Sequence, residues 1–301
     1  MPSAWPRFDP ALLATFLTVL EVGRVSAAAK ALHLSQPAVT AQLRKLEGAL
    51  GTVLFVRSAQ GVAPTEAGLR LAVHARAVRR LLEVAVADVA PKAEPSGPLA
   101  IAASTTIASH VLPILLGKFR VLHPDVAIQV HVDNTDGVVA AVRSGRVPLG
   151  LVEGHARASG VRLEAFLDDE IVPVVGRDAP FTIRHVRDLD TVPFLWREAG
   201  SGTRAVVERA VRQAGLPRRT ARHLDLELGS TEAILGCTVA NLGIAFVSLW
   251  SARVHITAGF VRVVPGLDLV LRRTFRWAVP AGGLGGMAAR FHAFAQTARL
   301  T

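Results

Sequence analysis

The alternation of apolar and polar positions over residues 1–65 predicts three helices followed by two short strands. The helices are expected over about 10–21, from Ser26 onward and after Ser35, since serine is a favoured N-cap. Pro37 fits the first turn of the third helix, because the N–H group that proline lacks would be unpaired there. The strands are expected at about 54–57 and 61–64, where they would form a β-wing.

The third helix has two contrasting faces. Apolar residues spaced by four, three and four positions predict a buried stripe: Val39, Leu43, Leu46 and Leu50. Polar residues spaced by four positions form a neighbouring face that stays free for a partner: Gln36, Thr40 and Arg44. Because a short turn joins this helix to the preceding one, the pair matches a helix-turn-helix.

The N-terminal turns of the second helix in such a motif reach the base edges of DNA. Gln36 could pair with adenine or bridge to a phosphate, and Thr40 could contact either group. Phosphate contacts suit four further side chains: Ser35, Arg44, Arg57 and Thr65. The alternative is a solvated polar face of a small helical domain, and spacing alone leaves both interpretations open.

The apolar segment 11–20, "ALLATFLTVL", has the length of a signal-peptide core. However, only Arg7 precedes it as a positive charge, Asp9 adjoins it, and no convincing cleavage site follows. A buried helix is therefore the better interpretation. The chain contains no run of about 18 apolar residues, so no membrane span is expected.

A long helix is expected from Thr65, as its cap, to about Val89. It carries a heptad seam: Leu71, Ala75, Val78, Leu82, Ala85 and Val89. Such a seam is buried best against a second helix, so dimerisation is preferred, and packing on the chain's own domain is the alternative. Three prolines within 91–98 predict a hinge after the helix.

Beyond the hinge, short strand-like runs alternate with helical runs, which predicts parallel βαβ units. One set extends over about 99–153 and a second, similar set over about 171–248. Two such units joined by crossing strands indicate two lobes with a cleft between them. Ligands in open α/β sheets bind beyond the carboxyl ends of the strands.

Three strand-to-helix junctions carry the candidate ligand-binding residues: Ser104, Thr105 and Thr106; Ser201, Gly202 and Thr203; and Thr231. Each junction offers free backbone N–H groups and the positive end of a helix dipole, which suits an anion. Ordinary helix caps are the alternative. Arg204 could add charge or point to solvent. Glu153 could accept hydroxyls or a cationic group, or be a surface loop residue.

Composition changes the picture only slightly. The net charge of +10 favours a polyanionic partner, but residues 1–90 hold ten Lys/Arg against six Asp/Glu and the remainder holds 24 against 18, so charge locates no site. The single cysteine, Cys237, excludes an internal disulfide and fits a reducing cytoplasm. Since no Cys/His pattern has metal-ligand spacing, neither a metal nor another cofactor is expected.

The run "SAAAKALHLSQPAVTAQLRKLE", followed by "LFVR" and "TEAG", resembles the N-terminal domain of the LysR-type transcriptional regulators over about sixty residues. The resemblance implies that Gln36, Pro37 and Thr40 face DNA, and Ser26 is a further candidate DNA-binding residue. Family wings are often rich in arginine, whereas "SAQG" has no charge after Arg57, which puts minor-groove contacts by the wing in doubt.

The stretches "GSGTR" and "LELGSTEAI", with "LGIAFVS", resemble the effector-binding domain of the same family, most closely its regulators of carbon fixation and of sulfur or nitrogen assimilation. The resemblance implies an effector site at these positions: Ser104, Thr105, Thr106, Glu153, Ser201, Gly202 and Thr231. It also implies a homodimer through the long helix, and often a homotetramer.

The expected fold class is α/β, with an N-terminal winged helix-turn-helix at 1–65, a linker helix at 66–90, a hinge at 91–97 and a two-lobed effector domain at 98–301. That last domain would be like the type 2 periplasmic binding proteins. Its first lobe is expected at about 98–170 and 272–301, and its second at about 171–271.

The expected function is a cytoplasmic regulator that binds double-stranded promoter DNA and responds to a small anionic metabolite held between the lobes. RNA polymerase is a candidate further partner. A solute-binding protein of a transport system shares the two-lobed architecture, but the missing signal peptide and the additional N-terminal domain argue against it. An enzyme acting on a phosphate substrate at "GSGTR" is the third alternative, although no Ser/His/Asp order, nucleophile elbow or P-loop is present.

Overall fold

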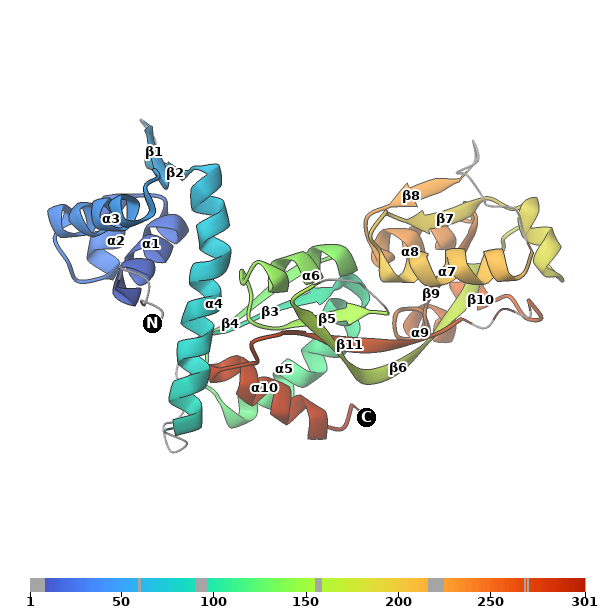
Figure 1. Cartoon of the computed structure of the whole chain (residues 1–301). Coiled ribbons are helices and arrows are strands. Elements are labelled where there is room, and N and C mark those ends of the chain that lie inside the picture. Colours follow the sequence, from blue (N-terminus) through green and yellow to red (C-terminus); the bar gives the residue numbers. More distant parts are fainter. Residues whose placement is uncertain are drawn as a thin grey trace, which may run out of the picture. The chain divides into compact units, whose positions relative to one another are not determined.

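The computed structural model describes residues 9–58, 61–89, 97–154, 159–215, 225–267, 269 and 271–300, without the side chains of residues 57, 58, 87 and 88. The chain divides into two compact units, one containing residues 1–93 and 144–146 and the other containing residues 94–143 and 147–301 (Figure 1). The expected hinge, as far as residue 96, and the wing tip at 59–60 lie outside the described residues.

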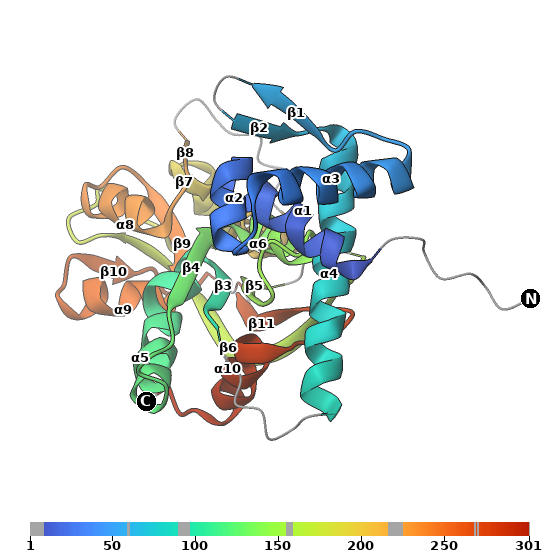
Figure 2. The ribbon, with the colours of Figure 1, turned by 90° about the vertical axis from the view of Figure 1, so that its left-hand side faces the viewer.

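The first unit follows the predicted order of elements (Figure 2). They are α1 (Pro10–Val22), α2 (Val25–Ala31), α3 (Gln36–Leu50), β1 (Phe55–Ser58), β2 (Gly61–Pro64) and α4 (Glu66–Val89). The predicted buried helix over 11–20 is confirmed, because α1 buries Leu12, Phe16 and Val19 in the core of this unit. β1 and β2 pair antiparallel as the wing.

Helix caps set the boundaries of these elements. Ser35 caps α3 by accepting the Ala38 N–H, and Gly51 ends α3 at a φ of 66°. The prediction that Ser26 caps the second helix is wrong: α2 begins one residue earlier, after Arg24, and has no side-chain cap. Gly23 ends α1 in the left-handed conformation and the extended Arg24 reverses the chain, so the next turn starts at Val25.

The predicted stripe on α3 is confirmed for Val39, Leu43 and Leu46, which are buried. It is wrong for Leu50, which is 36% exposed. Leu50 is the last residue of α3, immediately before Gly51, so it lies beyond the helical surface that packs on the core.

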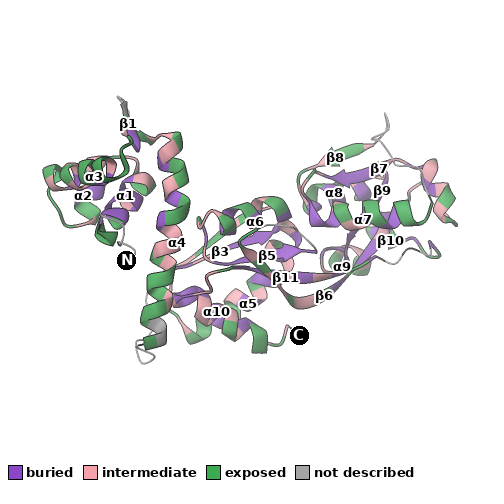
Figure 3. Ribbon diagram, viewed as in Figure 1, coloured by how far each residue is buried: buried purple, intermediate pink, exposed green. Residues whose placement is uncertain are grey.

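The alternative that the seam packs on the chain's own domain holds for the first half of α4 only. Its first half packs on the core of the first unit through Leu71, Ala75 and Val78. Its second half leaves Leu82 53% exposed and Val89 83% exposed, with Leu81 and Val86 also exposed (Figure 3). Thr65 accepts the Gly68 N–H at 3.0 Å, which confirms it as the cap of α4.

The second unit is built on a nine-stranded sheet in the order β4-β3-β5-β11-β6-β9-β7-β8, with β10 paired to β6. The first lobe contains β3 (Leu99–Ser104), the π-helix η1 (Ile107–Val111), α5 (Leu112–Leu122), β4 (Ile128–Asp133), α6 (Thr135–Arg143), β5 (Gly150–Glu153) and α10 (Gly286–Thr297). Its largest core surrounds Phe119, Trp277 and Phe291.

The second lobe contains the 3-10 helix η2 (Val186–Asp190), β7 (Phe194–Arg197), α7 (Gly202–Gln213), β8 (Leu226–Leu228), α8 (Thr231–Val239), β9 (Ile244–Ser248), α9 (Leu249–Thr257) and β10 (Val261–Val263). One of its cores surrounds Phe194, Trp196 and Val207. The parallel β3–β4 and β7–β9 pairs confirm the predicted βαβ pattern in both lobes.

Two long strands connect the lobes, β6 (Val161–Gly176) and β11 (Arg272–Pro280), which pair antiparallel (Figure 1). The sequence predicted only the second half of β6 and none of the elements after Leu249. Within the described residues, no helix has both the length and the apolar character needed to cross a bilayer.

Candidate functional site

The first candidate surface is the polar face of α3. Gln36 and Arg44 are exposed and Thr40 is half-buried, on the face next to the buried stripe. Within the described part of the chain, none of these three side chains has a hydrogen-bond or ion-pair partner. The face is therefore chemically available to an external partner, as the spacing predicted.

The other predicted DNA-binding residues differ in their exposure and in whether their side chains already make hydrogen bonds. Pro37 is exposed in the first turn of α3, and Ser26 is exposed in the first turn of α2. The hydroxyls of Ser35 and Thr65 serve as helix caps, and Thr65 also donates to the Val53 carbonyl at 2.8 Å. Arg57 lies in β1, but its side chain lies outside the described residues.

The three hydroxyl-bearing junctions of the second unit are linked to one another, first through Glu153. This glutamate ends β5 and accepts the backbone N–H of Thr106 at 3.0 Å on one carboxylate oxygen. The other oxygen accepts the hydroxyl of Thr203 at 2.8 Å. The junction before η1 and the junction before α7 therefore meet at one buried carboxylate.

Arg197 links the second junction to the third. It is 3% exposed at the end of β7, and its guanidinium donates to the Thr231 hydroxyl at 2.9 Å and to Glu198 at 2.8 and 2.9 Å. Its backbone carbonyl accepts from Arg204 of α7 at 2.9 Å. The start of α8 is thereby held next to the start of α7.

A third contact completes the ring. The Nε2 atom of His110, in η1, lies 3.1 Å from Oε1 of Glu232, in the first turn of α8. The three strand-to-helix junctions thus form one closed ring of contacts, which we call the junction ring: residues 104–106, 201–203 and 230–232. Since α7 and α8 both begin there, two helix dipoles present their positive ends to it.

The hydroxyls at the first junction have no partner in the described part of the molecule. Ser104 and Thr106 are 2% and 1% exposed, and the hydroxyl oxygens of Ser104, Thr105 and Thr106 make no hydrogen bond. A buried hydroxyl without a partner costs about 1–3 kcal/mol, and such groups are uncommon in folded proteins. Three together are the arrangement expected where a ligand supplies the missing partners.

The remaining predicted residues of the ring already have partners. Ser201 caps α7 by accepting the Arg204 N–H at 3.4 Å, and the Thr231 hydroxyl accepts from Arg197. Gly202 is required by space, because a Cβ atom there would overlap the carbonyl oxygen of Glu153 and crowd Thr135. The structure therefore brings all the predicted positions together, and within the described residues the unpartnered hydroxyls among them lie at the first junction.

Two interpretations of charged residues are wrong. Glu153 is not a surface loop residue, since it is 1% exposed, and its carboxylate is occupied by Arg273, whose Nη1 lies 2.7 Å away. Arg204 neither adds charge to the ring nor points freely to solvent, because it pairs with Glu208 at 2.8 Å and Glu227 at 2.6 Å. The pairs Arg273–Glu153 and Arg204–Glu227 each join two different elements. Local spacing in the sequence cannot reveal such pairs.

The electrostatics of Glu153 follow from this pairing. Burial by itself would raise the pKa of the carboxyl, but the guanidinium groups of Arg273 and Arg197 and the hydrogen bonds from Thr203 and Thr106 outweigh it and lower the pKa to about 2. Glu153 is therefore a carboxylate at every physiological pH. Its charge is compensated within the protein.

Sequence reasoning missed four residues of this region. Arg273 holds Glu153 and also pairs with Asp169 at 2.7 Å, and Asp169 accepts the Ser248 hydroxyl at 2.6 Å. Arg197 and His110 close the ring. The available signal was an arginine adjoining apolar strand residues, as in "FLWR" and "RRTFRWAVP", because a charge in a buried strand requires a partner.

A helix-turn-helix with an exposed polar face and a two-lobed α/β domain with buried, unpartnered hydroxyls together indicate a class of protein, the ligand-responsive DNA-binding regulators. Comparison with known families agrees. Residues 10–69 match the model of the bacterial regulatory helix-turn-helix protein, lysR family, and residues 92–299 match the LysR substrate binding domain. The chain belongs to the LysR family of DNA-binding transcriptional regulators, with an effector-binding domain.

Curated relatives span most of the chain. The uncharacterized HTH-type transcriptional regulator YeiE of Escherichia coli (strain K12) is 35% identical over 88% of this chain and 89% of its own. A probable RuBisCO transcriptional regulator of Emiliania huxleyi is 30% identical over 85% and 84%, and CysL of Bacillus subtilis (strain 168) is 32% identical over 74% and 76%. These relatives are regulators, so the transporter and enzyme alternatives are set aside.

Solved structures show the same fold. A full-length OxyR variant from Pseudomonas aeruginosa gives a TM-score of 0.78 at 22% identity, covering 96% of this chain and 94% of that one. The regulatory domain of Synechocystis PCC6803 CcmR, in complex with 2-PG, gives a TM-score of 0.59 at 25% identity, covering 67% of this chain and 96% of that one.

Proposed function

We propose that the junction ring binds a small anionic effector and that this binding controls how α3 reads promoter DNA. The observation that carries the proposal is the set of unpartnered hydroxyls of Ser104, Thr105 and Thr106, next to the N-termini of α7 and α8. Hydroxyls, free N–H groups and dipole ends suit an oxyanion. The 2-PG found with the CcmR regulatory domain supports a small-molecule ligand for a domain of this fold.

A thermal-shift screen of the full chain against anionic metabolites tests the effector site. A ligand at the ring should raise the melting temperature of the wild type, since binding to the folded state stabilises it. The substitution Thr105→Tyr should abolish the shift by placing a bulky ring beside the unpartnered hydroxyls of Ser104 and Thr106. An equal shift in the variant would place the ligand elsewhere.

The DNA-reading role rests on the open face of α3. Gln36→Ala should reduce discrimination between selected and random duplexes by about 5- to 150-fold, the value of one good base contact. Arg44→Ala should instead weaken binding to both and reduce the salt slope by about one, because a phosphate contact releases a counterion. Fluorescence anisotropy at several salt concentrations measures both effects, and an unchanged preference in Gln36→Ala would contradict the assignment.

Dimerisation is the proposed role of the exposed apolar half of α4. Leu81, Leu82, Val86 and Val89 would be buried against the same helix of a second copy. Two such dimers would form a tetramer, in which effector binding shifts the spacing of the reading helices, provided that the effector prefers one arrangement. Leu82→Glu with Val86→Glu should yield monomers in sedimentation analysis, and an unchanged mass would contradict this role.

The domain boundaries expected at 65, 90 and 97, and a cytoplasmic location suited to a protein that meets promoter DNA, remain parts of this proposal. RNA polymerase remains a candidate partner of the DNA-bound form.

A further inference from the structure

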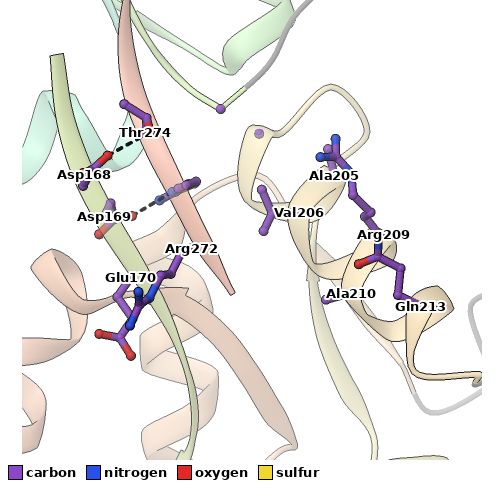
Figure 4. A pocket seen from close by; sticks show the side chains of 13 residues that line it. Asp168, Asp169, Glu170, Ala205, Val206, Arg209, Ala210, Gln213, Arg272 and Thr274 are labelled. Carbon is purple, nitrogen blue, oxygen red and sulfur yellow. Dashed lines mark hydrogen bonds and ion pairs between the residues drawn. The ribbon is translucent and has the colours of Figure 1, made fainter. Parts of the chain in front are cut away.

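A pocket lies beside the strands that connect the lobes. Its volume is about 710 Å³, within the range typical of small-molecule sites. One wall is α7, from Gly202 to Gln213, and the other is formed by β6 and β11 (Figure 4). Of the residues predicted for the effector, Gly202 alone lines it. We call it the hinge pocket because it lies beside the strands that connect the lobes; the name does not refer to the predicted hinge at 91–97.

The two walls of the hinge pocket each present an arginine without a partner. Arg209 projects from α7 and Arg272 from β11 (Figure 4). Across the described ranges, neither guanidinium makes a hydrogen bond or an ion pair. An unpaired guanidinium is suited to an acid group, which it can bind with two parallel hydrogen bonds.

A third arginine at this pocket is buried and incompletely bonded. Arg273 is 6% exposed, and its Nη2 has no hydrogen-bond partner, whereas its Nε and Nη1 hold Asp169 and Glu153. An unsatisfied buried donor is costly. Arg273 is therefore a fixed part of the pocket wall, held by the two carboxylates.

The pocket also presents negative charge, which restricts the ligand. Glu170 lies opposite Arg272 in the β6–β11 ladder and has no partner in the described part of the chain, while Asp168 accepts the Thr274 hydroxyl at 2.9 Å. The charges without an ion-pair partner in the described residues are therefore two cations, Arg209 and Arg272, and two carboxylates, Asp168 and Glu170. A ligand that matches them carries both acid groups and an ammonium group.

We propose that the hinge pocket binds a small amino acid with a second acid group, its two carboxylates between Arg209 and Arg272 and its ammonium at Glu170. This site adjoins the junction ring, because Gly202 belongs to both and because Nη1 of Arg273, in the pocket wall, holds the glutamate that binds Thr106. The coupling between this pocket and an effector at the junction ring rests on the proposed function, whereas binding at the hinge pocket does not.

Calorimetric titration of the full chain with L-glutamate as the probe, and with glutarate as the analogue without an amino group, tests the proposal. The wild type should bind one glutamate per chain, at least about tenfold more tightly than glutarate, because one charge-assisted contact has about that effect. Arg209→Gln and Arg272→Gln should each weaken glutamate binding about tenfold or more. Glu170→Gln should remove the preference for glutamate over glutarate.

Arg120→Gln is the matched control, since Arg120 is an exposed arginine on α5, away from both sites. It should bind glutamate as the wild type does, and Thr105→Tyr should too if the probe occupies the hinge pocket. The proposal is overturned if the wild type binds no glutamate, if glutarate binds as tightly, or if both arginine variants match Arg120→Gln. If Thr105→Tyr lost glutamate binding while the arginine variants kept it, the probe would bind at the junction ring, and the proposal would be overturned as well.

Discussion

The polar face of α3 and the polar cluster around Glu153 use similar side chains in opposite ways. On α3, Gln36 and Arg44 are exposed and have no partner within the described residues. Around Glu153, the charges are buried and paired with a charge on another element. The comparison teaches that the first surface is available for recognition, whereas the second is part of the fold. Substitutions on α3 should change DNA binding and not stability, whereas substitutions of the buried charged residues around Glu153 should lower stability.

The largest expected effect is the removal of the buried arginine. Arg273→Met leaves Glu153 and Asp169 as uncompensated buried charges, which should lower the free energy of unfolding of the second unit by about 3–5 kcal/mol. Arg44→Met on α3 is the matched control and should change it by less than about 0.5 kcal/mol. Urea unfolding measures both free energies, and similar losses of unfolding free energy in the two variants would contradict the difference between the two regions.

The pH dependence of stability should carry the signature of Glu153. Its pKa is lowered from 4.5 to about 2 in the folded protein. Its contribution, about 3 kcal/mol, is therefore fully present above pH 4.5 and is lost as the pH falls towards 2. By pH 3 about 2 kcal/mol should be gone. Glu153→Gln lacks this titration, so its unfolding free energy should fall less between pH 6 and pH 3. Parallel curves would contradict the pairing.

Substitutions at two helical glycines distinguish the effect of close packing from that of helix propensity. Gly202→Ala forces a Cβ atom against the Glu153 carbonyl and should cost roughly 1–3 kcal/mol. Gly236→Ala, in α8, has open space around the added carbon and should be neutral or stabilising by up to about 1 kcal/mol. Thermal unfolding distinguishes the two, and equal tolerance would show that α7 begins farther from Glu153.

The smallest stability effect is expected on the recognition face. Gln36→Ala should change the free energy of unfolding by less than about 0.5 kcal/mol, because Gln36 is exposed and has no partner in the described part of the chain. Its loss of DNA discrimination should occur without any shift of the urea midpoint. A substantial loss of stability would show that Gln36 supports the fold.

The same contrast explains how far the sequence could predict this molecule. The faces of α3, the wing strands and the three junctions follow from local periodicity and capping, so they were predictable. The predictions that Leu50 is buried and that Ser26 caps a helix were wrong, because the position of a helix end depends on the chain segments next to it. The pairing of Glu153 with Arg273 joins residues 120 positions apart, and nothing in local spacing encodes it. The predicted acceptor for an effector was therefore a carboxylate already occupied by the protein.

The most direct test of the central claim joins the two regions in one measurement. A duplex selected from random sequence by the wild type is titrated, in the presence of each anion that raises the melting temperature, with the wild type and with Thr105→Tyr. We predict that at least one anion changes the Kd for the duplex by about fivefold or more, a typical allosteric coupling, and that Thr105→Tyr shows no change. The same change in both proteins would contradict control from the junction ring.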